Sequence, residues 1–259
     1  MDMGRILEDS FKYPASNWKR VLIFGVIVLI YQFSLQFFML YINASILVVL
    51  LIIPFIISYL LLEGYQLRAI GTSINGEMEP PKLNNWLKML VDGFKLFIVG
   101  LVYGIIPGII LGVGFVLLFT VPSGLNLLGI LILLLGLVIL FIVSLIMVMA
   151  ISNMAYYGKL EAAFKLGEIK ERIRKLGWLN YILVLIIVVL LGALLSVGAA
   201  FVSFIPILGF VLACFIVYPY LYLFIARAYA LIYLETMEDE PEEPLTEMKN
   251  FPGTETNPN

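Results

Sequence analysis

Few side chains in the apolar parts of this 259-residue sequence carry groups that could do chemistry. Three tracts, 21–62, 96–158 and 176–226, contain no Asp, Glu, Lys or Arg. Four of their polar side chains suit the lining of a pathway for a neutral solute: Gln32, Gln36, Tyr103 and Ser144. Gln32 and Gln36 are four residues apart, so they share one face of a helix. The simpler interpretation is that these side chains form hydrogen bonds between neighbouring helices.

The residue types that are missing exclude most catalytic chemistry. The sequence has no histidine, which removes the commonest general base, Ser–His triads and most zinc or haem sites. Its single cysteine, Cys214, cannot form an internal disulfide or a cysteine metal site. The apolar tracts also lack the buried carboxylates and bases that coupled carriers and intramembrane enzymes use. We therefore expect no catalytic residues, no cofactor, no metal ion and no enzymatic activity.

The composition is that of a protein embedded in a membrane. Hydrophobic residues make up 62% and charged residues 13% of the sequence, and the mean hydropathy is +1.05. A soluble domain has roughly 45–50% apolar and about 25% charged residues. The predicted fold class is therefore all-α, an integral membrane helical bundle.

Each apolar tract is long enough for two membrane crossings of about 20 residues. Turn signals near Asn43, Pro122 and Pro206 divide the three tracts. A single transmembrane domain, 1–234, is expected, followed by an acidic, proline-containing and disordered tail, 235–259. The domain is predicted to contain three hairpins built from six transmembrane helices, at about 20–40, 45–63, 96–119, 126–151, 179–203 and 207–233.

The basic residues predict how the helices cross the membrane. All 16 Lys and Arg lie before the first helix, after the second, after the fourth, or at and beyond the end of the sixth. Basic segments of a membrane protein stay preferentially in the cytoplasm. We therefore predict a multi-pass protein of the cell membrane with both termini in the cytoplasm.

Each hairpin follows a segment with the pattern of an amphipathic helix. Apolar residues recur every three or four positions in 83–94, and 159–177 repeats this pattern. The N-terminal segment is a weaker version. The three tryptophans, Trp18, Trp86 and Trp178, lie where these segments lead into the hairpins. We predict an amphipathic interfacial helix before each hairpin, with the tryptophans at the membrane interface.

One glycine pattern stands out in the third predicted helix. Gly100, Gly104, Gly108 and Gly112 follow one another at every fourth position in an uncharged run. Residues at this spacing share a face of the helix, and small residues let another helix backbone approach closely in a membrane. We predict that this face is a packing seam within the bundle. A contact between two copies of the chain and a moving element are the alternatives.

Short motifs in the charged segments resemble those of an uncharacterised multi-pass membrane family, domain of unknown function 4013, which is common in methanogenic archaea. The resemblance covers about residues 5–235. It implies an archaeal cell membrane and carries no established activity. The motifs are Asp9–Pro14 with Trp18, Gly64-Tyr65-x-x-Arg68, Gly76 through Pro80-Pro81, Trp86, Asp92-Gly93-x-Lys95, and Ala162-Ala163-Phe164-x-x-Gly167-Glu168-Ile169.

Two functions from different classes fit these patterns. The leading hypothesis is a non-enzymatic membrane protein whose cytoplasmic surface helices bind lipid headgroups, a protein partner or a second copy of the chain. The basic cluster 170–175 attracts anionic lipid at about 1 kcal/mol per charge near the surface. Three nearby acids, Glu161, Glu168 and Glu171, dilute this cluster and argue against nucleic acid as a partner. The alternative is a permease or channel for a neutral or lipid-like solute.

The orientation can be tested with single cysteines in a chain that carries Cys214→Ser. A cysteine at Ser123→Cys is expected to react with a membrane-impermeant thiol reagent added to intact cells. A cysteine at Lys165→Cys should react only after the membrane has been permeabilised. Labelling of Lys165→Cys from outside intact cells would overturn the predicted orientation.

Overall fold

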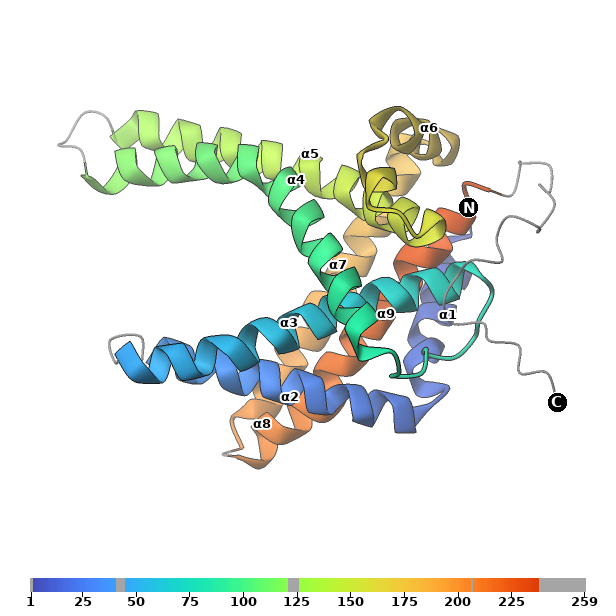
Figure 1. Cartoon of the computed structure of the whole chain (residues 1–259). Helices are drawn as coiled ribbons and strands as arrows, with labels where there is room; N and C mark the ends of the chain where they lie inside the picture. Colours follow the sequence, from blue (N-terminus) through green and yellow to red (C-terminus); the bar gives the residue numbers. More distant parts are fainter. Residues whose placement is uncertain (1, 41–44, 121–125, 206, 238–259) are drawn as a thin grey trace.

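The computed structural model describes residues 2–40, 45–120, 126–205 and 207–237, which are helical with no strand among them. Figure 1 shows how the helices are arranged. In chain order they are α1 (Met3–Ala15), α2 (Trp18–Leu40), α3 (Ser45–Ile74), α4 (Trp86–Thr120), α5 (Asn126–Tyr157), the 3-10 helix η1 (Leu160–Phe164), α6 (Leu166–Leu176), α7 (Trp178–Ser203), α8 (Leu208–Leu212), the π-helix η2 (Ala213–Val217) and α9 (Tyr218–Leu234).

Six of the described helices are long and apolar enough to cross a membrane, which confirms the predicted helical membrane bundle. Two of them extend well past the uncharged tracts. α3 continues to Ile74 and α4 already begins at Trp86, because Ile70, Ile74 and Met89 are buried against neighbouring helices. The predicted turns at 41–44, 121–125 and 206 lie outside the described residues. So does the predicted tail from residue 238 onward.

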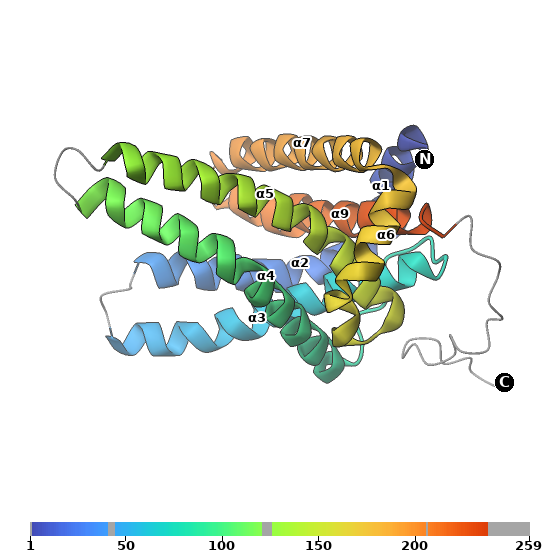
Figure 2. The same ribbon diagram turned by 90° about the horizontal axis from the view of Figure 1, so that it is seen from above.

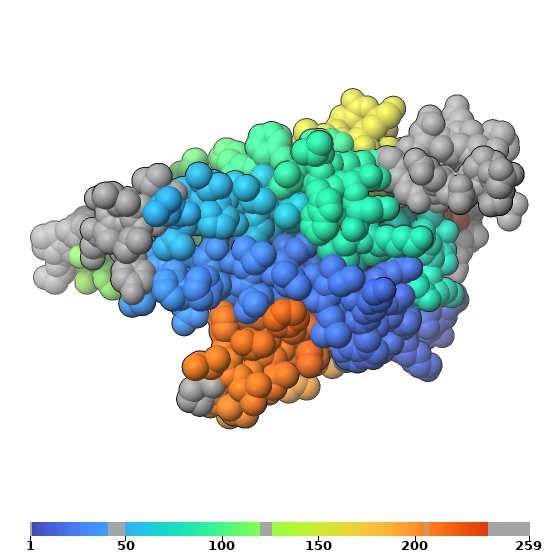
Figure 3. Space-filling view, turned by 60° about the horizontal axis from the view of Figure 1, so that its bottom comes forward, coloured from blue at the N-terminus to red at the C-terminus, as the bar shows by residue number. Residues whose placement is uncertain are grey.

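The long helices form three hairpins that point in one direction, as Figure 2 shows. They are α2 with α3, α4 with α5, and α7 with the continuous run of α8, η2 and α9. We call the end that carries α1, η1, α6 and segment 75–85 the charged end, and the opposite end the turn end. In the space-filling view of Figure 3, α2 lies between α3 and the hairpin that contains η2.

The predicted surface helices differ in part from the structure. α1 precedes the first hairpin, and η1 and α6 precede the third. Before the second hairpin there is no separate helix, because the amphipathic pattern of 83–94 continues directly into α4. The apolar faces of α1 and α6 are also buried against protein, through Ile6 in α1 and Ile169 and Ile173 in α6. The apolar faces of α1 and α6, which the sequence pattern predicts at the membrane surface, therefore pack against other helices of the protein.

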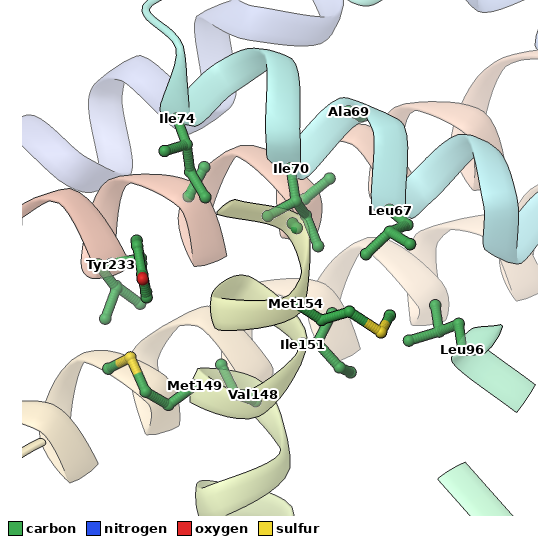
Figure 4. Packing of buried hydrophobic residues seen from close by; sticks show 14 of the residues in the cluster. Leu67, Ala69, Ile70, Ile74, Leu96, Val148, Met149, Ile151, Met154 and Tyr233 are labelled. Atoms are coloured by element: carbon green, nitrogen blue, oxygen red, sulfur yellow. The ribbon is translucent and has the colours of Figure 1, made fainter. Parts of the chain in front are cut away.

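The hydrophobic core lies where α3, α5 and α9 converge toward the charged end. Figure 4 shows Ile70 and Ile74 of α3 across from Met149 and Met154 of α5, with Tyr233 of α9 beside them. The buried residues of α5 lie almost entirely between Leu145 and Ala155, with only glycines buried nearer the turn end. The hairpins are therefore held together mainly by their charged-end halves.

Helices α3 and α4 cross at two glycines, where their backbones touch. A Cβ atom placed on Gly64 would lie 1.9 Å from the Met89 carbonyl oxygen, and one on Gly93 would lie 1.9 Å from the Leu60 carbonyl oxygen. No side chain fits into such a gap. The crossing therefore requires glycine on both helices.

The predicted packing seam at Gly100, Gly104, Gly108 and Gly112 is wrong for the bundle itself. No described atom lies within 4 Å of a Cβ placed on any of the four. The α4–α5 hairpin closes on a different face of α4, where Gly114 meets Leu133 and Gly136 of α5 meets Leu111. This contact turns the glycine stripe away from α5. A contact with a second copy of the chain stays a prediction.

A short π-helix interrupts the last hairpin at the level of α2. Pro219 lacks an N–H, so the α-helical hydrogen bond to the carbonyl of Phe215 cannot form. The N–H of Tyr218 instead bonds to the carbonyl of Ala213, the five-residue spacing of a π-helix. Gly25 of α2 lies against this backbone, because its Cβ position is 2.8 Å from the Phe215 oxygen.

The two sets of glycines in α4 give a matched test. Gly93→Ala should lower the free energy of unfolding by about 3 kcal/mol or more, because its methyl group would collide with backbone. Gly104→Ala, on the same helix, should leave stability unchanged or slightly raise it, since the methyl group enters open space. Thermal unfolding of both variants in detergent measures the difference. Equal stability of the two variants would contradict the crossing.

Candidate functional site at the charged end

Segment 75–85, which joins α3 to α4, is fixed by side chains that donate hydrogen bonds to its backbone. The Tyr65 hydroxyl donates to the Pro81 carbonyl at 2.9 Å. The Arg20 guanidinium donates to the Pro80 carbonyl and pairs with the Glu79 carboxylate at 3.2 Å. Prolines lack an N–H and favour extended backbone, so their carbonyls are free to accept these bonds. α2 and α3 thus hold the segment from two sides.

Two further arginines also bind the backbone of segment 75–85. We call this set of side chains the clamp. Arg68 of α3 donates to the carbonyl of Asn84 at 2.7 Å, and Arg227 of α9 donates to the carbonyl of Glu77 at 2.9 Å. The Arg227 guanidinium also lies 5.2 Å from the centre of the Tyr13 ring, within the range of a cation–π contact. Burial raises the pKa of the Tyr13 phenol, so it stays neutral beside this cation. α1 and α9 are linked to the segment in this way.

A second cluster joins α6 to the end of α9. Arg172 is nearly buried and forms an ion pair with Glu168 at 3.1 Å. It also donates to the Thr236 hydroxyl at 3.3 Å, and its guanidinium lies 4.7 Å from the centre of the Tyr233 ring. Thr236 is 1% exposed. The first residues of the predicted disordered tail therefore pack onto the domain.

Hydrogen bonds also anchor η1 beneath α5. The Tyr233 hydroxyl donates to Asn153 Oδ1 at 2.7 Å, and Asn153 Nδ2 donates to the Ala162 carbonyl at 2.9 Å. From α4, the Tyr103 hydroxyl donates to the Ala163 carbonyl at 2.7 Å. Three helices therefore meet at this short turn.

The side chains of these two clusters bond mainly to backbone carbonyls and to one another. Glu168, Glu79 and Asp92 each form an ion pair with a neighbouring Lys or Arg. Among the residues that the structure describes, no group of three or more His, Cys, Asp or Glu could hold a metal ion. The motifs quoted above, including Gly64-Tyr65-x-x-Arg68 and the Ala162–Ile169 run, supply many of these contacts.

A hollow opens on the surface between α4 and the end of α5. It is shallow and open to the surroundings, has a volume of about 640 Å³, and is lined by Lys95, Gly158, Lys159, Leu160, Glu161 and Phe164. Lys95 pairs with Asp92 at 3.4 Å, across one turn of α4. Lys159 is exposed and forms no ion pair with another described residue. The hollow therefore brings two lysines and one glutamate together at the surface where α4 meets the end of α5.

The residues predicted to line a pathway do not form one lining. Tyr103 is bonded to Ala163, and the Ser144 hydroxyl donates to the Phe141 carbonyl of its own helix. Gln32 is partly buried and Gln36 is exposed on α2. Their use by a solute stays a prediction.

The three tryptophans begin the first helix of each hairpin. Trp18, Trp86 and Trp178 are 46%, 47% and 45% exposed, and each is the first residue of its helix. Tryptophan side chains suit the boundary between lipid and water. Their place at a membrane interface remains a prediction.

The position of Glu63 within a candidate membrane span was not predicted from the sequence. The uncharged tract ends one residue before it, so its carboxyl group was expected at the boundary of a helix that ended there. α3 instead continues to Ile74, which places Glu63 within a candidate membrane span. The signal that points to it is Tyr59, four residues earlier on the same face, followed by helix-compatible residues up to Ile74.

Comparison with known proteins gives one match. A family model described as "Protein of unknown function (DUF4013)" matches residues 46–204, which is more than half of the chain. No curated protein matches the chain, and no solved structure does.

The buried hydroxyl of Tyr233 has a matched control in Tyr157. Tyr233→Phe leaves Asn153 without its partner and should cost about 1–3 kcal/mol of unfolding free energy. Tyr157→Phe removes a bond to Glu168 at an exposed side chain and should cost less than about 1 kcal/mol. Denaturation followed by circular dichroism compares the two. A larger loss for Tyr157→Phe would show that the buried network does not hold α9 to α5.

Proposed function

The chain belongs to the DUF4013 family of proteins of unknown function, and we propose that it is a non-enzymatic multi-pass membrane protein whose charged end binds anionic lipid headgroups. The observation that carries this proposal is the hollow lined by Lys95 and Lys159. Asp92 pairs with Lys95 and Glu161 also lines the hollow, so Lys159 is the lysine of the lining without a described ion-pair partner, and it offers a positive charge to a phosphate diester. Membrane lipids are therefore its proposed partners.

The position of the hollow supports a lipid as the ligand. Lys95 lies nine residues into α4 from Trp86, about 13 Å along the helix axis. With Trp86 at the interface, the Lys95 ammonium group reaches the headgroup level by extending its side chain. Phe164, at the edge of the hollow, offers an apolar surface to the first part of an acyl chain. A free anion in water would gain nothing from that contact.

The proposed orientation places the charged end in the cytoplasm of the cell membrane. The segments that carry Lys and Arg all belong to this end, apart from Lys249 in the part of the chain that the structure leaves out. This asymmetry supports the positive-inside arrangement. The inner leaflet would then supply anionic headgroups to Lys95 and Lys159.

Other roles have weaker support. The bare glycine face of α4 is the proposed contact for a second copy of the chain or another membrane protein. The acids on α6 and η1 argue against nucleic acid as a partner. A permease is favoured by one specific observation, the acidic Glu63 within α3, because transport pathways commonly contain intramembrane charges.

Lipid binding can be measured by native mass spectrometry of the protein in detergent with added phosphatidylglycerol or phosphatidylcholine. We expect phosphatidylglycerol to be retained preferentially. Lys95→Gln and Lys159→Gln should each weaken its binding about fivefold, since one charge contributes about 1 kcal/mol near a surface.

The control for this experiment is Lys12→Gln. Lys12 is exposed on α1, where its salt bridge with Glu8 raises its pKa, and it lies outside the hollow. Its loss should not change lipid retention. Equal weakening by all three variants would indicate non-specific attraction, and unchanged retention in Lys95→Gln and Lys159→Gln would refute the proposed site.

A further inference from the structure

Glu63 is an acidic side chain within the candidate membrane span of α3, one residue after the uncharged tract ends. It lies eighteen residues from Ser45 and eleven from Ile74, about 27 Å and about 17 Å along the helix axis. The candidate span extends from Leu50 to Ile74. Charged side chains within a membrane span are costly and commonly mark functional sites.

Tyrosines from three helices lie near this carboxyl group. Tyr31 of α2, Tyr59 of α3 and Tyr222 of α9 each interact electrostatically with Glu63. The rings of Tyr31 and Tyr59 lie 6.2 Å apart, and Tyr59 precedes Glu63 by one helical turn. Phe55 stacks on Tyr31 at 5.4 Å and completes an aromatic wall. The four oxygen-bearing side chains thus form one cluster between α2, α3 and α9.

No described cation neutralises Glu63. The charged side chains of the packed helix α4 are Lys88, Asp92 and Lys95, which interact with one another and with Arg68. Glu63 forms no ion pair or hydrogen bond with another described residue, and the hydroxyls of Tyr31, Tyr59 and Tyr222 form no hydrogen bond with one either. Each of the four side chains is partly exposed rather than enclosed.

Such a cluster requires a polar occupant in a membrane. An unsatisfied polar group costs several kcal/mol in hydrocarbon, and an uncompensated carboxylate costs more. Among the described side chains of the cluster, Glu63 is the one carboxylate. The formal charge of the cluster is therefore −1, which one monovalent cation balances and a divalent ion does not. Carboxylate and hydroxyl oxygens are the ligands that hard cations prefer. The aromatic rings add attraction for a cation over their faces.

We propose that Glu63, together with the hydroxyls of Tyr31, Tyr59 and Tyr222, forms an intramembrane binding site for one monovalent cation, either a proton or an alkali-metal ion. The π-helix η2 lies directly before Tyr218 and Tyr222 on α9. π-helical turns in α-helices occur frequently at functional sites. The site is independent of the lipid hollow, because it uses other helices and other residues.

The test uses the full-length protein in detergent, with thermal unfolding measured against pH and against sodium or potassium concentration. Ionic strength is kept constant with a bulky organic cation. We expect the unfolding temperature of the native protein to rise with acid or with one of the alkali ions. Glu63→Gln, which carries no charge, should lose this rise. The matched control Glu171→Gln, an exposed acid on α6, should retain it.

Infrared difference spectroscopy separates the two cations. An absorption of the protonated carboxyl group that disappears in Glu63→Gln and does not respond to sodium or potassium identifies the proton. Stabilisation by an alkali ion at constant pH, lost in Glu63→Gln, identifies the metal ion. If the native protein and Glu63→Gln show the same dependence on pH and on both ions, and no carboxyl absorption differs between them, the site does not exist.

Two milder variants keep the proposal testable if Glu63→Gln fails to fold. Tyr59→Phe and Tyr222→Phe remove only a hydroxyl group and keep the rings in place. Each should reduce the cation-dependent rise in unfolding temperature without lowering stability in the absence of the cation. An unchanged rise in both variants would overturn the proposed role of the hydroxyl groups.

Discussion

The direct backbone contact between α3 and α4 is the constraint on which the rest of the structure depends. Gly64 and Gly93 bring the two helices so close that each Cβ position falls on a carbonyl oxygen of the partner. The same residues belong to the sequences that supply Tyr65, Arg68 and Lys95. The crossing therefore positions both the clamp on segment 75–85 and one wall of the hollow. The packing of α3 on α4 and the positions of the polar side chains at the charged end therefore both depend on these two glycines.

The sequence predicts the class, the helices and the hairpins of this protein, because apolar length and turn residues are local properties. It does not predict which glycines lie in contacts. The stripe from Gly100 to Gly112 has the stronger pattern, whereas the tight crossing uses single glycines with charged neighbours. Contact depends on the rotation of each helix about its axis, and the face that α5 occupies decides that rotation. Periodicity within one helix carries no information about its neighbour.

The residues of the candidate sites also come from separate helices, so the sequence does not predict that they lie together. Lys95 and Lys159 are sixty-four positions apart and meet only because η1 folds back beneath α5. The place of Glu63 became clear only once the end of α3 was known. The uncharged sequence before a carboxyl group is the same whether the helix ends there or continues. Tyr31 and Tyr222 reach it from other helices. The individual residues were visible in the sequence, but their assembly was not.

The α4–α5 hairpin is both the longest and the least supported by the rest of the bundle. Its helices contain 35 and 32 residues, or about 52 and about 48 Å, while the hydrocarbon layer is about 30 Å thick. A helix longer than the layer adapts by tilting or by thickening the lipid around it. The other two hairpins brace each other through α2, whereas the outer half of this one stands apart from them, as Figure 1 shows. In a bilayer, the thickness of the hydrocarbon layer would therefore act on its tilt, and a change in lipid composition would alter the shape of the protein without any ligand.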